Sequence, residues 1–111
     1  MGKRGRRGGM TTHLWTWGGK DFGDRDGDEL WTYDGRHVGH FHGAEIYGAD
    51  GSYLGELQRD DHLITRTAKQ LQHRKAFTPL PNRPARAIFI GFNELALPKG
   101  YQDFPSPDAL R

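Results

Sequence analysis

Residues 13–60 read HLWTWGGKDFGDRDGD, ELWTYDGRHVGHFHGA and EIYGADGSYLGELQRD when they are written in blocks of sixteen. A fourth, more degenerate block, HLITRTAKQLQHRKAF, occupies residues 62–77 after one inserted residue, Asp60 or Asp61. Position 2 of every block is Leu or Ile, position 10 is apolar in all four, and positions 7 and 11 are glycine in the first three. Self-similarity at a fixed period is the signature of tandem structural repeats.

Each block has the pattern of a β-hairpin. In the second block, the apolar and aromatic residues 30–33 lead into Asp34-Gly35, and residues 36–41 form the return strand. Asp-Gly favours a two-residue type I′ turn, because glycine accepts a positive φ without steric cost. One hairpin is not stable alone in water. We therefore expect four tandem 16-residue hairpins in an all-β, flower-like arrangement with pseudo-four-fold symmetry.

Three positions of the repeat have predicted roles. We expect the side chains at positions 2 and 10 to face the shared core. The glycine at position 11 lies inside a strand, where it normally lowers stability, so its recurrence indicates a close backbone approach or a bulge. The fourth block has Gln72 there and lacks the turn glycine. It is expected to close the ring in a distorted way.

The flanking segments differ from the repeats in composition. Residues 1–12 are rich in Gly and Arg and are expected to be a disordered basic tail. Residues 78–111 form a C-terminal extension with Pro79, Pro81 and Pro84 near its start, which exclude a helix or a central strand there. Residues 85–97 are strongly apolar and fit both helical and strand spacing, and a helix is preferred. This extension is expected to pack on the β domain or on a partner, with Phe104 as an anchor.

Composition restricts the class of protein. The 111 residues are enough for one domain, only 34% are hydrophobic, and there is no cysteine, which excludes disulfides and thiolate metal sites. No apolar run is long enough for a transmembrane helix, and the basic N-terminus lacks the apolar region of a secretory signal. A cytoplasmic location is the expectation.

The net charge of +2 hides a strong segregation of charge. Residues 13–61 hold eleven acidic and four basic side chains, whereas residues 62–92 hold six basic and no acidic ones. The basic residues form a possible contact for a polyanion such as nucleic acid. They are Arg4, Arg6, Arg7, Arg66, Lys69, Arg74 and Lys75. The alternatives are a solubilising N-terminal tail and pairing of the later cations with the acidic repeats, and this internal pairing is preferred.

Two sets of repeat residues are candidate ligand sites. Position 12 holds Asp24, His40, Glu56 and His73, which would form a ring able to bind a divalent ion if the symmetry is real. The preferred alternative is a rim of paired or solvent-exposed groups. Position 3 holds aromatic residues in the first three blocks, which either stack a ligand or, as we prefer, pack in the interior. They are Trp15, Trp31 and Tyr47.

Known catalytic motifs are absent from the sequence. There is no nucleophile elbow, zinc-protease motif, phosphate loop or dinucleotide fingerprint, and the acidic side chains of the repeats sit mostly at turns. The sequence predicts no enzyme, no metal and no cofactor.

The units LWTYDGRHVGHFHGAEIYGADGSYLGEL, the basic block LITRTAKQLQHRKAFTP and the ending GYQDFPSP resemble the bacterial 4-fold beta flower domain family. The resemblance covers roughly residues 13–108, and the Arg/Gly N-terminus and residues 80–97 depart from it. It implies a compact, four-petalled β fold and no catalytic residues. The expected function is a non-enzymatic structural or interaction module, with an unknown protein partner or self-association. Weak nucleic-acid binding through the basic tail and fourth repeat is the alternative.

Overall fold

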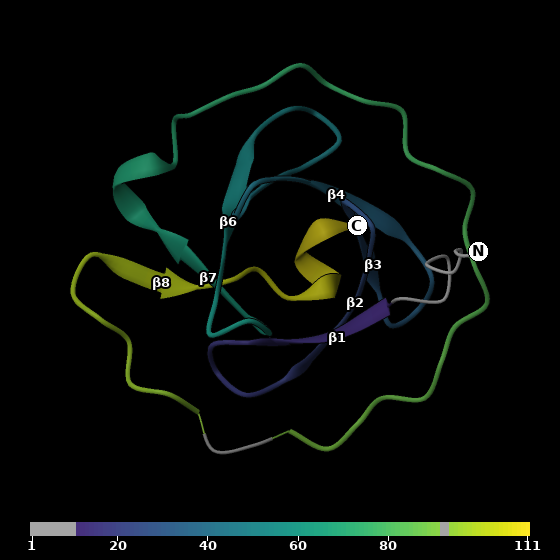
Figure 1. Cartoon of the computed structure of the whole chain (residues 1–111), viewed down its shortest axis with the longest axis horizontal. Helices are drawn as coiled ribbons and strands as arrows, with labels where there is room; N and C mark the ends of the chain where they lie inside the picture. Colours follow the sequence, from purple (N-terminus) through teal and green to yellow (C-terminus); the bar gives the residue numbers. More distant parts are fainter. Residues whose placement is uncertain (1–10, 92–93) are drawn as a thin grey trace, which may run out of the picture.

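Eight β-strands make up most of the regular structure in the computed structural model, which describes residues 11–91 and 94–111. They are β1 (Thr11–Thr16), β2 (Asp21–Asp26), β3 (Glu29–Thr32), β4 (His37–His42), β5 (Glu45–Tyr47), β6 (Tyr53–Gln58), β7 (His62–Arg66) and β8 (Tyr101–Asp103). Consecutive strands pair antiparallel, and β1 also pairs in parallel with β7. This pairing closes seven strands into a mixed barrel with β8 as an extra strand (Figure 1). The predicted all-β class is confirmed.

Thr11 and Thr12 belong to β1, although the sequence analysis placed them in the disordered tail. Two short 3-10 helices, η2 (Thr67–Lys69) and η3 (Pro107–Leu110), are the only helical elements of the described residues. The second of these lies within the ring of strands near the C-terminus (Figure 1).

The first three repeats are hairpins with the same register. In each of them the residue at position 2 lies opposite the glycine at position 11, and the residue at position 10 is a bulge. The opposed pairs are Leu14↔Gly23, Leu30↔Gly39 and Ile46↔Gly55. A side chain at Gly23 would collide with the carbonyl oxygen of Trp31, and one at Gly55 with that of Ile64. The predicted bulge and close backbone approach are both present.

The hairpin turns differ from the prediction. Gly19 N–H donates to Thr16 O at 2.9 Å and Thr16 N–H donates to Lys20 O at 2.8 Å, so the loop has three residues. Gly19 has a φ of 86°, whereas Gly18 is not among the positive-φ residues. This is a type I turn followed by a left-handed residue. The predicted two-residue type I′ turn is wrong, because only the second glycine takes a positive φ.

The fourth repeat is not a hairpin, which corrects the prediction. After β7 and η2 the chain leaves the barrel, and Leu71, expected in the core at position 10, is 97% exposed. The chain end replaces the missing return strand: β8 pairs with β7 through Ile64↔Asp103, as Trp15 pairs with Asp21 in the first repeat. The physical reason is that residues 67–77 are mainly polar and charged.

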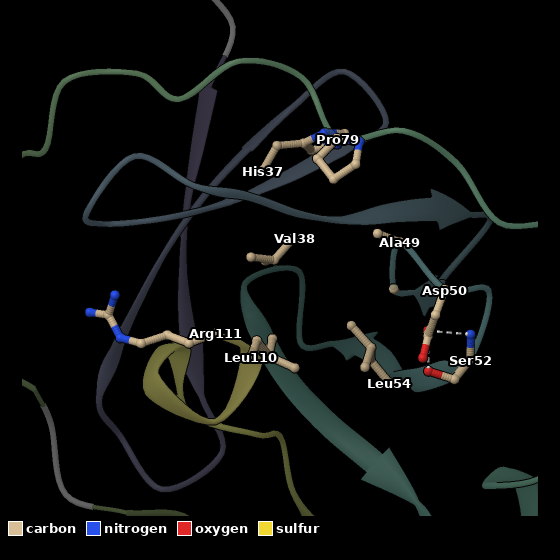
Figure 2. A pocket seen from close by; sticks show the side chains of 10 residues that line it. His37, Val38, Ala49, Asp50, Ser52, Leu54, Pro79, Leu110 and Arg111 are labelled. Atoms are coloured by element: carbon tan, nitrogen blue, oxygen red, sulfur yellow. Dashed lines mark hydrogen bonds between the residues drawn. The ribbon is translucent and has the colours of Figure 1, made fainter.

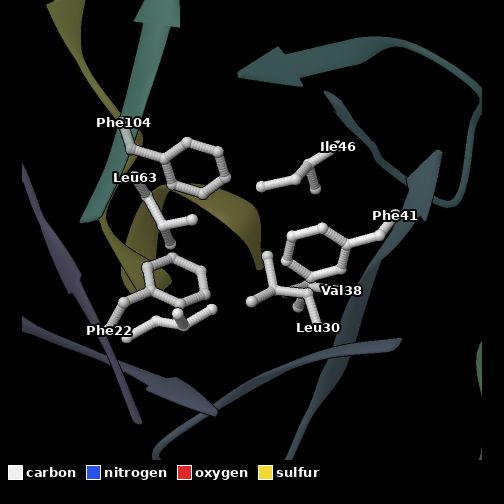
Figure 3. Close-up of a cluster of buried hydrophobic side chains, with 8 residues drawn as sticks. Phe22, Leu30, Val38, Phe41, Ile46, Leu63 and Phe104 are labelled. Atoms are coloured by element: carbon white, nitrogen blue, oxygen red, sulfur yellow. The ribbon is translucent and has the colours of Figure 1, made fainter. Parts of the chain in front are cut away.

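Phe104 therefore takes the place of position 10 in the fourth repeat. It is 3% exposed and packs edge-to-face on Phe22, with ring centroids 5.2 Å apart. Its predicted role as an anchor is confirmed. The core around it is drawn in Figure 3 and consists of Leu14, Phe22, Leu30, Val38, Phe41, Ile46, Leu63 and Phe104. In the first three repeats, positions 2 and 10 supply most of this core, as predicted.

Residues 71–91 and 94–97, here called the belt, run around the outside of the barrel (Figure 1). The described residues of the belt form neither helix nor strand, so the preferred helix over residues 85–97 is wrong. The reason lies in where the backbone N–H groups point. They donate to the barrel, and a helix would need them for its own carbonyls.

Candidate functional site

Every third residue of the belt, where described, donates its backbone N–H to the barrel. The donors are Arg74, Phe77, Leu80, Arg83, Arg86, Phe89 and Leu95. Their acceptors, in the same order, are Gly51 O, Ala49 O, His37 Nδ1, Gly35 O, Tyr33 O, Asp21 Oδ2 and Trp17 O. Three residues per turn is the period of a polyproline II helix. The three prolines near the start of the belt fall between donors, where no N–H is needed.

The belt and the barrel repeat in step. The donors Phe77, Arg86 and Leu95 are nine residues apart. Their acceptors, Ala49, Tyr33 and Trp17, are sixteen residues apart and run in the opposite order. A step of nine residues along the belt therefore corresponds to a step of one 16-residue hairpin in the barrel. Phe77, Arg86 and Leu95 bind the same position of the third, second and first hairpins.

Positions 1, 9 and 12 of each hairpin form a polar cluster that faces the C-terminal part of the chain. The clusters are His13/Asp21/Asp24, Glu29/His37/His40 and Glu45/Tyr53/Glu56. In the first cluster Arg86 bridges the two aspartates, and in the third Lys69 bridges the two glutamates. Arg86 binds the first, with its guanidinium 2.7 Å from Asp21 and 3.0 Å from Asp24. The Leu80 N–H binds the second, and Lys69 Nζ lies 2.6 Å from Glu45 in the third.

Hydrogen-bond partners set the pKa values of the charged groups in these clusters. Burial alone would raise the pKa of Asp21, but hydrogen bonds from Arg86, the Phe89 amide and His13 outweigh it and hold that pKa below its usual value. A hydrogen bond from Lys69 lowers the pKa of Glu45. The same bond raises the pKa of Lys69. These groups are therefore ion pairs that fasten the fold at neutral pH.

The position-12 residues do not come together in one ring. Asp24 binds Arg86, and His40 lies 3.1 Å from Glu29. Glu56 accepts from Tyr53, and His73 contacts the carbonyl of Asp50. Within residues 11–91 and 94–111, no group of three or more such side chains is arranged to hold a metal ion. Three Asp–His or Glu–His pairs join position 1 to position 9 or 12 of the same hairpin, namely His13–Asp21, Glu29–His37 and Glu29–His40. A further pair joins the sequence neighbours Asp61 and His62 at 2.7 Å.

The position-3 aromatic residues are covered by other side chains. Trp15, Trp31 and Tyr47 are all buried. The guanidinium of Arg83 lies 3.8 Å from the ring centre of Trp31, and that of Arg74 lies 5.3 Å from Tyr47. The preferred prediction, interior packing, is confirmed. These aromatics form an outer layer between the barrel and the belt, separate from the central core.

Two equivalent pockets open between neighbouring hairpins beneath the belt. The first, about 340 Å³, has Val38, Leu54 and Leu110 on its floor and His37 and Pro79 at its upper wall (Figure 2). The second, about 310 Å³, is lined among others by Asp21 and Ile88. Asp21 and His37 share repeat position 9, and Ile88 follows Pro79 by nine residues. The two pockets are thus related by the repeat.

Some of the cations predicted to contact a polyanion form ion pairs within the molecule. Arg66 Nε lies 3.6 Å and Lys69 Nζ 3.7 Å from Glu56. Arg74 stacks on Tyr47, and no ion pair of Lys75 occurs within the described residues. This supports the preferred internal pairing of the basic segment. Arg4, Arg6 and Arg7 lie outside the described residues.

Large exposed apolar side chains of the described residues gather on the belt. They are Leu71, Leu80, Ile88, Phe89, Ile90 and Leu97. Ile88, Phe89 and Ile90 are consecutive, and Ile90 is 94% exposed. Large contiguous apolar patches are uncommon on soluble monomers and often mark interaction sites, so residues 88–90 are the candidate contact on the belt.

No family model matches the chain, and neither the curated proteins nor the solved structures include a match. The resemblance to the 4-fold beta flower family therefore stays a prediction from the residues. None of the helices in the described part of the chain has the length and apolar character that a membrane crossing requires.

Sequence reasoning missed Asp21 and His37 as the side chains that accept hydrogen bonds from the belt. One signal was present: position 9 is polar in the first three repeats, as Asp21, His37 and Tyr53, although it lies next to the core position 10. The partner of these residues is 43 or more positions away in the sequence, so the pairing itself has no local signature.

Proposed function

We propose that this chain is a non-enzymatic interaction module that associates through the outer face of its belt, first of all with a second copy of itself. The observation that carries the proposal is the gathering of exposed apolar side chains on the belt, with three in succession at Ile88, Phe89 and Ile90. We also propose that the three hairpins and the β7–β8 pair together form the pseudo-four-fold, flower-like arrangement that the repeat predicts.

The distribution of charge supports an apolar contact. Arg83 and Arg86, which flank the segment on its N-terminal side, pair with Asp26 and Asp21 of the barrel. What residues 88–90 offer to a partner is apolar side chains and backbone groups. Burying such surface is favourable in proportion to its area.

Sedimentation velocity of the full chain over a range of concentrations tests the proposal. We expect concentration-dependent association in the wild type and a shift to monomer in the double variant Ile88→Ser/Ile90→Ser. Leu71→Ser changes a side chain that is about as exposed as Ile90 but lies on the belt outside residues 88–90, and as the control it should leave association unchanged.

A wild type that stays monomeric at every concentration contradicts self-association. Retention of the full chain on heparin that weakens with salt would favour the nucleic-acid alternative instead. Association that survives the double variant would place the contact elsewhere.

A further inference from the structure

The belt is fastened to the barrel by acceptors of two kinds. Five of the seven described acceptors are backbone carbonyls, which do not titrate. The other two are the side chains of Asp21 and His37. The lowered pKa of Asp21 keeps its carboxylate ionised well below neutral pH. Imidazole differs, because its ordinary change of charge falls between pH 5 and 8.

The contacts of His37 leave only one arrangement of its ring protons. The Leu80 N–H donates to Nδ1 over 2.8 Å, so Nδ1 must carry a lone pair. Nε2 lies 2.7 Å from Glu29 Oε1, which can only accept, so Nε2 carries the proton. A second proton on Nδ1 would turn the acceptor into a donor that faces another donor. The bond to the belt would then be lost.

Charged and titratable groups surround this ring on every side. Glu29 on β3 favours a positive ring, and His40 on β4 shares the same carboxylate at 3.1 Å. On the belt side, Phe77 packs on the ring, and Arg83 pairs with Asp26. Asp50 and Arg111 line the same pocket as His37. The His37 side chain is 2% exposed, so Glu29 is the group that makes a buried positive ring tolerable.

Among the described contacts, the stretch of belt held by His37 has no other hydrogen bond to the barrel. Phe77 N–H binds Ala49 O on one side, and Arg83 N–H binds Gly35 O on the other. Of the residues between them, Pro79 and Pro81 have no N–H, and among the described contacts only Leu80 donates to the barrel. Pro79 is also a wall of the first pocket (Figure 2). Release at Leu80 therefore frees residues 78–82 and with them this wall.

We propose that protonation of His37 is a pH switch that detaches residues 78–82 of the belt and opens the pocket between the second and third hairpins. The hydrogen bond between Leu80 and His37 holds the belt while the ring is neutral, and it is lost when the ring is protonated as the pH falls. This goes beyond the proposed association, since it concerns the first pocket and not the apolar segment at residues 88–90.

Amide hydrogen exchange of the full ¹⁵N-labelled chain tests the switch. Protection factors of Leu80, Phe77 and Arg83 are measured from about pH 7.5 to about pH 5, alongside the titration of the His37 ring. We expect Leu80 protection to fall about tenfold as the ring protonates, which is the effect of losing one hydrogen bond. Phe77 and Arg83, bound to backbone carbonyls, should keep their protection.

Two variants separate the switch from a general loss of stability. His37→Asn places an amide oxygen near the position of Nδ1 and should hold Leu80 at every pH. His40→Asn removes the neighbouring imidazole on Glu29 and its ring contact with Phe77, but no hydrogen bond to the belt, and should keep the wild-type response. Unchanged Leu80 protection while His37 protonates would overturn the proposal. So would a ring that stays neutral down to acid unfolding, or a response lost in His40→Asn.

Discussion

Asp21 serves the barrel and the belt at once. Its carboxylate is buried and lies 2.8 Å from His13 of the same hairpin. From the belt it accepts hydrogen bonds from the guanidinium of Arg86 and from the amide of Phe89. A buried carboxylate with three partners stabilises a fold only while it is ionised, so this residue links stability to pH.

We predict that Asp21→Asn lowers the free energy of unfolding by about 2 kcal/mol at neutral pH, because it leaves Arg86 without its closest partner. The folded-state pKa of Asp21 lies below the unfolded value of 3.8. The contribution of the carboxylate is therefore present above that value and is lost as the pH falls through the lowered pKa. Urea unfolding followed by tryptophan fluorescence should show the gap between wild type and variant closing below about pH 4.

Asp24→Asn is the matched control, since Asp24 binds the same guanidinium but is more exposed. Asp24→Asn should lower the free energy of unfolding at neutral pH by less than Asp21→Asn does. A gap between wild type and Asp21→Asn that stays constant into strong acid would show that the carboxylate does not act through its charge.

At the scale of elements, the belt is an extended segment whose order comes from the barrel. Its N–H donors recur every three residues, and its prolines occupy positions in between. A polyproline II segment makes no internal hydrogen bonds. The belt is therefore ordered only where its N–H donors find acceptors. A proline substitution should lower the free energy of unfolding at donor positions and have little effect at the positions between them.

We predict that Leu80→Pro lowers the free energy of unfolding by about 1–2 kcal/mol, because it removes the N–H that His37 accepts. Asn82→Pro, two residues away, removes an N–H with no partner among the described residues and should be neutral or slightly stabilising. Urea unfolding of both variants measures the difference. Equal losses in the two would contradict the three-residue pattern.

At the scale of the whole molecule, the chain end completes the core of the barrel that β1–β7 close. β8 follows the belt once the belt has passed around the strands, and Phe104 enters the core there (Figures 1 and 3). Arg36 then holds η3 in place by donating to the carbonyls of Pro107 and Leu110. The chain end is thus held against the second hairpin by contacts between residues more than seventy positions apart.

We predict that Phe104→Ala lowers the free energy of unfolding by about 3–4 kcal/mol, as expected for removing a buried aromatic ring. Leu71→Ala should change it by less than about 0.5 kcal/mol, because this side chain lies in solvent. Thermal and urea unfolding of the two variants decide the matter. If Leu71→Ala lowered the free energy of unfolding more than Phe104→Ala, then Leu71 and not Phe104 would supply the core side chain of the fourth repeat.

Local sequence was sufficient for the three regular hairpins. Leu14, Leu30 and Ile46 face the core as their spacing predicts, and Gly23 and Gly55 mark close backbone contacts. These properties depend on the two-residue alternation of a strand and on the absence of a Cβ, both of which can be read from neighbouring residues. Pairing of the basic segment with the acidic repeats followed equally from the segregation of charge.

Only the tertiary structure decided how the ring closes, what the apolar residues 85–97 do, and which side chains fasten the belt. β8 and Phe104 replace the return strand of the fourth repeat because they supply an apolar ring where residues 67–77 are mostly polar or charged. Residues 85–97 fit both helical and strand spacing, and a helix is the preferred prediction, yet the barrel offers acceptors to the N–H groups of Arg86, Phe89 and Leu95. Whether this segment is helical or extended depends on hydrogen-bond acceptors that are distant in sequence, and local helix propensity does not include them.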